Sequence, residues 1–131
     1  MTLVAITQSP DDYAALRQIA ADNGWKLSIV ASSAEAIALL KVQPTPLVIC
    51  DREISGEDWR EALARIAGLP QAVCVLLASR VVDEYLWHQV IENHGYDVVA
   101  KPFQAEALRR AVTFAWSWRG WAHLQDRRNQ A

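Results

Sequence analysis

The chain has 131 residues and a formal net charge of -2; 52% of its residues are hydrophobic and 21% are charged. This length and composition suit one globular domain with a single core, and the charge gives no overall preference for nucleic acid. No apolar stretch reaches the roughly 20 residues needed to cross a bilayer. The first residues also lack the basic start and cleavage site of a signal peptide, so we expect a cytoplasmic protein.

Five short apolar runs predict β-strands, and a segment with helical periodicity or helix-start signals follows each of them. The expected strands are 3–7, 26–31, 47–50, 73–78 and 98–100. The expected helices are 10–23, 32–42, 58–67, 83–94 and a last one from about 104 to beyond 121. This alternation with short loops predicts an α/β fold: a doubly wound, five-stranded parallel sheet with an extended C-terminal helix.

The helices carry recognisable end signals. Ser9 suits the N-cap of the first helix and Pro10 its first position. The next two residues are acidic and complement the positive end of the helix dipole: Asp11 and Asp12. Gly24 and Gly95 are expected to end the first and fourth helices. Helical spacing assigns a buried stripe on the first helix to Tyr13, Leu16, Ile19 and Ala20.

The strands differ in expected burial. The runs 47–50 and 73–78 are apolar at every position, which is typical of strands covered on both faces, whereas 26–31 alternates like a half-exposed edge strand. Cys50 and Cys74 lie within the apolar runs, and we interpret them as buried small side chains.

Three polar residues follow three of the predicted strands. Asp51 follows the third strand, Ser79 the fourth and Lys101 the fifth. Because the carboxyl ends of parallel strands meet at one edge of a sheet, we expect these three side chains to converge there. A small-ligand or catalytic site at the same edge is one alternative interpretation of this convergence.

Three segments together resemble the receiver domain of two-component response regulators. They are 51–58 after the third strand, Ser79 with the helix start at 83–84, and 95–103 with its Lys101-Pro102-Phe103 ending. The resemblance covers about residues 2–118. It implies a flavodoxin-like fold with strand order 2-1-3-4-5, and a non-enzymatic signalling module similar to chemotaxis regulators.

The resemblance also implies roles for individual residues. Asp51 matches the phosphoacceptor that receives phosphate from a histidine kinase, while Ser79 and Lys101 match the hydroxyl and ammonium groups that contact the phosphoryl group. In this family Mg²⁺ assists the transfer, and its matching ligands here are Asp51 and the backbone carbonyl of Glu53. The Lys-Pro peptide bond of the family is commonly cis.

The chain departs from the family where the first strand ends. Thr7 and Gln8 stand in place of the acidic pair that holds the metal, and Mg²⁺ prefers charged oxygen ligands. Asp11 and Asp12, or an inward Glu53 side chain, are possible substitutes, but the helix dipole and an exposed loop already account for them. We therefore expect a degenerate phosphorylation site in a module that acts through protein contacts. The alternative is a working phosphoacceptor at Asp51.

The fifth strand lacks an aromatic residue. Val98 and Val99 stand where the family often has a Tyr or Phe whose rotamer follows phosphorylation. Tyr96 lies just before the strand and Phe103 matches the common aromatic after Lys-Pro. We expect the usual aromatic relay to be absent or rerouted.

The C-terminal helix has two apolar stripes where a surface helix needs one. The first stripe should pack on the sheet: Leu108, Ala111, Val112 and Ala115. The second consists of Phe114, Trp118 and Trp121, and its composition favours a homodimer or a protein partner. The alternative is that the C-terminal helix folds back over its own domain, and the acidic net charge argues against a nucleic-acid partner.

We expect one receiver-like domain over 1–131, with 119–131 as a helical extension or frayed tail.

Overall fold

The computed structural model describes the backbone of residues 1–129 and the side chains of residues 1–117. Its strands are β1 Thr2–Ile6, β2 Lys26–Val30, β3 Leu47–Asp51, β4 Cys74–Ser79 and β5 Asp97–Ala100. Its helices are α1 Pro10–Asn23, α2 Ser33–Val42, α3 Trp59–Ala67, α4 Glu84–Glu92 and α5 Ala105–Asn129. The strands form one parallel sheet in the order β2-β1-β3-β4-β5, which confirms the predicted fold class.

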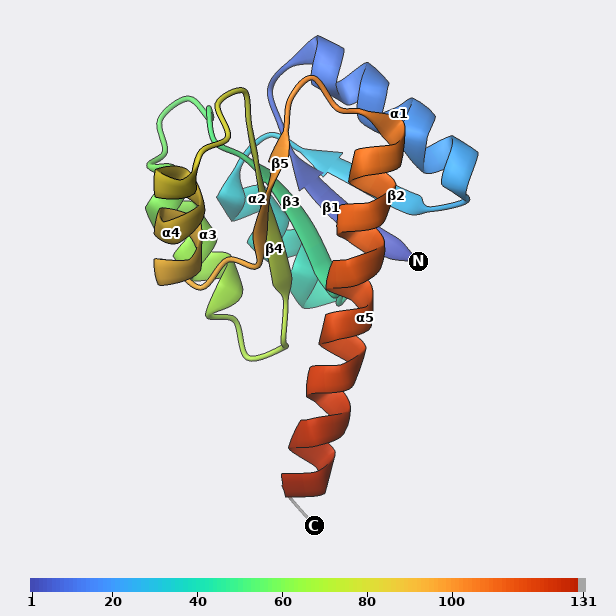
Figure 1. Ribbon diagram of the computed structural model, residues 1–131, viewed down its shortest axis with the longest axis vertical. Coiled ribbons are helices and arrows are strands. Elements are labelled where there is room, and N and C mark those ends of the chain that lie inside the picture. Colours follow the sequence, from blue (N-terminus) through green and yellow to red (C-terminus); the bar gives the residue numbers. More distant parts are fainter. Residues whose placement is uncertain (130–131) are drawn as a thin grey trace.

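The sheet separates two hydrophobic cores, with α1 and α5 on one face and α2, α3 and α4 on the other (Figure 1). Every residue of β3 and β4 is buried, whereas β2 at the edge is only half-buried, as the apolar and alternating patterns predict. Each large aliphatic side chain buried in this way contributes about 1.5–3 kcal/mol relative to exposure. The cores therefore hold the carboxyl ends of the central strands in fixed positions.

The first helix begins and ends where its signals predict, but its buried stripe differs in one position. The Ser9 side chain accepts a hydrogen bond from the Asp12 N–H at 3.3 Å, and Gly24 adopts a left-handed conformation with φ of 69°. The prediction that Tyr13 is buried is wrong, because it is 44% exposed and lies against the Arg17 guanidinium. The inner position belongs to Asp12, which is one helical turn before the buried Leu16.

The fourth helix ends earlier than predicted. It stops at Glu92, and His94 rather than Gly95 adopts the left-handed conformation, with φ of 70°. Gly95 is needed for space instead, because a Cβ atom there would lie 2.5 Å from Val90 Cγ1. Gly95 also closes the helix end, because its N–H donates to the Val90 carbonyl at 2.9 Å, and the lack of a Cβ atom permits this close approach.

Both cysteines occupy the buried strand positions that the sequence predicts. Burial, together with the nearby negative charges of Asp51 and Glu57, raises the pKa of the Cys50 thiol to about 12. Because the thiolate is the reactive form, this environment makes Cys50 a packing residue and not a nucleophile.

Candidate functional site

The three predicted site residues lie at the upper end of the sheet in Figure 1, where the strands end. Asp51 is the last residue of β3 and Ser79 the last of β4, while Lys101 directly follows β5. All three are buried, with 3%, 2% and 7% of their surface exposed. The Lys101 N–H donates to the Ser79 carbonyl at 2.9 Å, so the backbone joins two of the three positions directly.

Two carboxylates hold the Lys101 ammonium group. Lys101 Nζ donates to both oxygens of Asp51 at 3.0 Å and to Asp12 Oδ2 at 2.7 Å. Burial alone would lower the pKa of Lys101, but these hydrogen bonds and the two negative charges outweigh it and raise that pKa. The lysine is therefore charged at neutral pH and is paired with two buried counter-ions.

The sequence indicates Asp12 only as a substitute metal ligand and does not predict its ion pair with Lys101. The dipole of α1 explains an acidic residue at this position, and it also accounts for the exposed neighbour Asp11. A signal was nevertheless present, because Asp12 lies four residues before Leu16 and seven before Ile19, both on the inner face. An acidic residue on the buried stripe of a helix needs a partner, and Lys101 supplies it.

Thr7, which directly follows β1, contributes a neutral hydroxyl to the site. Thr7 is buried, its Oγ1 donates to Asp51 Oδ2 at 3.4 Å, and it accepts the Ser9 N–H at 3.1 Å. The Glu53 N–H donates to Asp51 Oδ1 at 3.1 Å. Asp51 is thus surrounded by hydrogen-bond donors, and these satisfy its charge without a metal ion.

Gln8 braces the loops around the site. Its Oε1 accepts the Ser55 N–H and its Nε2 donates to the Ala31 carbonyl, both at 3.1 Å. The side chain therefore joins the end of β1 to the loops that follow β2 and β3. With both polar atoms engaged in this way, the amide of Gln8 acts as a structural link between loops.

The oxygen atoms of these side chains are poor ligands for Mg²⁺. Among the residues with described side chains, no group of three or more His, Cys, Asp or Glu could hold a metal ion. Asp12 and Asp51 both face Lys101, while Thr7 and Gln8 offer only neutral oxygens to a cation that requires near-octahedral charged or water ligands. The residues at this edge match a lysine counter-ion site better than a divalent-cation site.

Ser79 faces its own loop. Its Oγ donates to the Val81 carbonyl at 2.7 Å, accepts the Val81 N–H at 3.2 Å and accepts Arg52 Nη1 at 3.4 Å. The structure therefore places Ser79 beside Asp51 and Lys101 at the sheet edge, but engages its hydroxyl in the turn that leads to α4.

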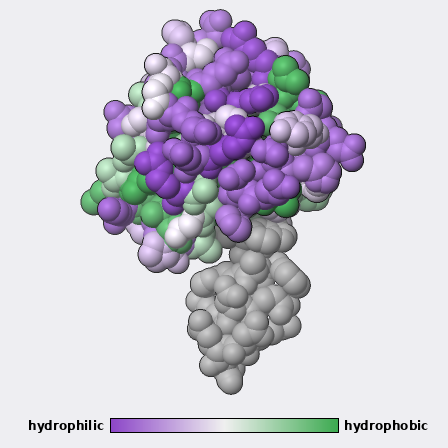
Figure 2. Space-filling view, turned by 90° about the vertical axis from the view of Figure 1, so that its left-hand side faces the viewer, coloured by the Kyte–Doolittle hydropathy of each residue, from purple (hydrophilic) through white to green (hydrophobic). Residues whose placement is uncertain are grey.

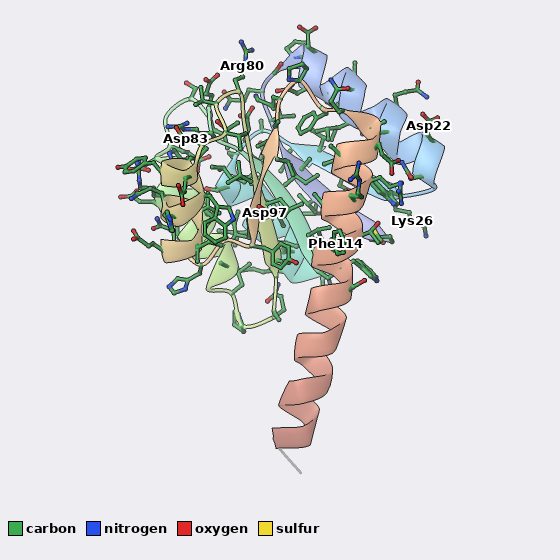
Figure 3. All side chains as sticks on the ribbon, in the orientation of Figure 1. Asp22, Lys26, Arg80, Asp83, Asp97 and Phe114 are labelled. Carbon is green, nitrogen blue, oxygen red and sulfur yellow. The ribbon has the colours of Figure 1, made fainter. Side chains whose placement is uncertain are left out.

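A depression of about 320 Å³ opens toward the site from solvent. Its lining comes from the start of α1, the loop after β4 and the turn after β5: Ser9, Asp11, Asp12, Arg80, Lys101 and Pro102. The Lys101–Pro102 peptide bond is cis, as the resemblance implies. Arg80 projects from the upper end of the molecule, so a positive side chain borders this entrance (Figure 3).

Glu57 anchors the loop that follows Asp51. Its carboxylate accepts the Ser33 N–H at 3.0 Å and the Ser33 hydroxyl, and Arg65 Nη2 lies 3.2 Å from it. Burial alone would raise the pKa of Glu57, but the Ser33 hydrogen bonds and the Arg65 charge hold it below its usual value. The β3–α3 loop is thereby fixed to the first turn of α2.

The aromatic residues near β5 pack inside the domain. Asp97–Ala100 contains no aromatic residue, and Tyr96 and Phe103 both pack against the core beneath α1 and α5.

On α5 the first predicted stripe is confirmed, since Leu108, Val112 and Ala115 are buried and Ala111 packs beside them. Phe114 is 65% exposed, whereas the predicted partners Trp118 and Trp121 lie outside the described side chains.

Comparisons with known proteins agree with this fold. Residues 5–113 match the family model of the response regulator receiver domain. The C4-dicarboxylate transport transcriptional regulatory protein DctD of Rhizobium meliloti (strain 1021) is 32% identical over 85 residues; the match covers 65% of this chain and 18% of DctD.

Solved structures show the same fold at lower identity. NtrX from Brucella abortus has a TM-score of 0.86 at 19% identity, covering 95% of this chain and 28% of NtrX. The chemotaxis response regulator CheY4 of Vibrio cholerae has a TM-score of 0.79 at 16% identity, covering 87% of this chain and 97% of CheY4. The family match, the strand order and the placement of Asp51 and Lys101 lead to one conclusion: this chain belongs to the response regulator receiver domain family.

Proposed function

We propose that this receiver domain is a cytoplasmic, non-enzymatic signalling module whose phosphorylation site is degenerate, and that it acts through protein contacts. One observation carries the proposal: the Lys101 ammonium is enclosed by Asp12 and Asp51 beside a neutral Thr7 and Gln8. This closed ion cluster satisfies the charges at the sheet edge without Mg²⁺ and without phosphate.

The first test measures phosphate uptake. Purified protein is incubated with acetyl phosphate, with and without Mg²⁺, and analysed by intact-mass spectrometry alongside Asp51→Asn. We expect no phosphate adduct on either protein, because the site lacks charged metal ligands and its lysine is occupied. An Mg²⁺-dependent adduct on the wild type that Asp51→Asn abolishes would instead establish the alternative, a phosphoacceptor served by a histidine kinase.

The contact surface that we favour lies on α5. Phe114 is 65% exposed and Trp116 is 38% exposed on this helix. Phe114 also borders a groove of about 380 Å³ between β5 and α5, whose other apolar lining includes Val98 and Ala111. The face over α3 and α4 is mostly hydrophilic (Figure 2), although residues 81–91, which lead into α4 and form it, expose Val81, Val82, Tyr85, Trp87 and Ile91. None of the helices, as far as the structure describes them, has the length and apolar character for crossing a membrane.

A charge placed on this surface should prevent self-association. We expect the wild type to form a dimer in light-scattering measurements and Phe114→Glu to be a monomer, because a buried unpaired carboxylate opposes association. Val42→Glu is the matched control, since Val42 is 82% exposed on α2, away from the groove. A wild type that stays monomeric at all concentrations would direct the search to a different protein partner.

A further inference from the structure

Two carboxylates share the Lys101 ammonium group. An ammonium group has three N–H bonds, and Lys101 Nζ has three carboxylate oxygens within hydrogen-bond distance. Two belong to Asp51, at 3.0 Å each, and the third is Asp12 Oδ2, at 2.7 Å. The lysine side chain is only 3% exposed, so water is largely excluded from this arrangement.

Asp12 is held in place by its own backbone. Its N–H is bound by the Ser9 side chain at 3.3 Å, and its helical turn is anchored by Leu16 in the core. The Asp12 side chain is 12% exposed. Asp12 is therefore pre-organised beside Lys101 and does not have to be drawn in from solvent.

We propose that Asp12 is a positioning residue that holds Lys101 and adds a negative charge beside Asp51, and that it thereby slows phosphoryl transfer to Asp51. This inference rests on the proposed function and gives it a second cause, independent of the neutral Thr7 and Gln8. Asp12 binds the Lys101 ammonium as an incoming phosphoryl group would. It therefore competes with the phosphoryl group for Lys101.

The chemistry of the transfer shows why Asp12 opposes it. In the reaction with acetyl phosphate, an Asp51 oxygen forms a bond to phosphorus. The bond from phosphorus to the acetyl oxygen breaks, and acetate leaves with the electron pair. The phosphoryl group that remains on Asp51 is negatively charged and close to the Asp12 carboxylate. Phosphorylation frees the Lys101 N–H that was bound to the Asp51 carboxylate, but Lys101 stays shared with Asp12. The Asp12 carboxylate then lies beside the phosphoryl anion and repels it.

The experiment separates the role of Asp12 from the loss of the acidic pair. Thr7→Asp/Gln8→Asp restores two acids at the end of β1, and the triple variant adds Asp12→Asn. The rate of adduct formation with acetyl phosphate and Mg²⁺ is measured for both by intact mass. We expect the triple variant to be labelled at least about tenfold faster than the double variant, a like-charge effect of ordinary size. Equal rates would overturn the role of Asp12.

Matched variants exclude a general charge effect. In the double-variant background, Asp11→Asn removes the same charge from the same helix turn, but Asp11 is exposed and is expected to leave the rate unchanged. Asp12→Glu keeps a carboxylate and is expected to stay slow. A rate increase with Asp11→Asn equal to that with Asp12→Asn would contradict the proposal.

Separate measurements report whether each variant is folded and whether it takes up phosphate. A rise in Tm with Mg²⁺ reports that the double and triple variants are folded and bind the ion. A folded triple variant that binds Mg²⁺ but takes up no phosphate overturns the proposal. Rapid labelling of the unmodified chain would instead overturn the proposed function, so the two failures are distinguishable.

Discussion

Replacing Lys101 by methionine is expected to lower the free energy of unfolding by about 3–5 kcal/mol, because it leaves buried carboxylates without their counter-ion. Asp51 and Asp12 both accept hydrogen bonds from this one ammonium group, and the Asp51 side chain is only 4% exposed. Methionine keeps much of the length of the lysine stem, so the loss reports mainly the missing charge. Urea denaturation monitored by circular dichroism measures it.

A double-mutant cycle identifies the source of that loss. Once Lys101 is absent, Asp12→Asn is expected to cost little or to restore stability, because it removes one of two repelling anions. Lys26→Met, at the exposed start of β2, is the matched control and should change stability by no more than about 0.5 kcal/mol. A Lys101→Met variant as stable as Lys26→Met would contradict an internal ion cluster.

Replacing Glu57 by alanine is expected to cost about 2–3 kcal/mol, since the buried Ser33 N–H and hydroxyl lose their acceptor. Glu61→Ala, exposed on α3, is the control and should be nearly neutral. Chemical denaturation of both variants tests the difference. Equal stabilities would mean that the β3–α3 loop does not depend on this anchor.

The Glu57 contribution should also depend on pH in a defined direction. Because the folded state holds the pKa of Glu57 below its ordinary value, the stabilisation is present above the ordinary pKa. It is lost as the pH falls through the lower folded-state pKa. The stability difference between the wild type and Glu57→Ala should therefore be full at neutral pH and shrink in acid.

Most of the fold follows from local patterns in the sequence. Continuous apolar runs identify β3 and β4 as central strands, and the alternation in β2 identifies an edge, because burial on one or two faces imposes these patterns directly. The helix starts at Ser9 and Asp83 were equally recognisable, since their side chains bind the first free N–H groups.

The site could be predicted only in outline. Strand ends bring Asp51 and Lys101 to one edge, but the partner of a buried charge depends on the tertiary fold, so Asp12 was assigned to the helix dipole. The direction of a hydroxyl is equally hidden, because Ser79 has one position in the chain but several possible acceptors. Gly95 shows the same limit, since one of the side chains that leave no room for a Cβ atom there is Leu63, which comes from α3.

The 25-residue helix α5 packs on the sheet and also extends beyond it, so a small change in its tilt moves its far end by a larger distance. At 1.5 Å per residue the helix is about 37 Å long, and Figure 1 shows that its far part extends well past the sheet. Within the described side chains of α5, Leu108, Val112 and Ala115 attach its near part to the core. From Val112 to the end of the helix is about 25 Å, so a tilt of about 10° there would displace the far end by about 4 Å. A sub-ångström repacking beneath β5 would thus be magnified into a displacement that a bound protein can register.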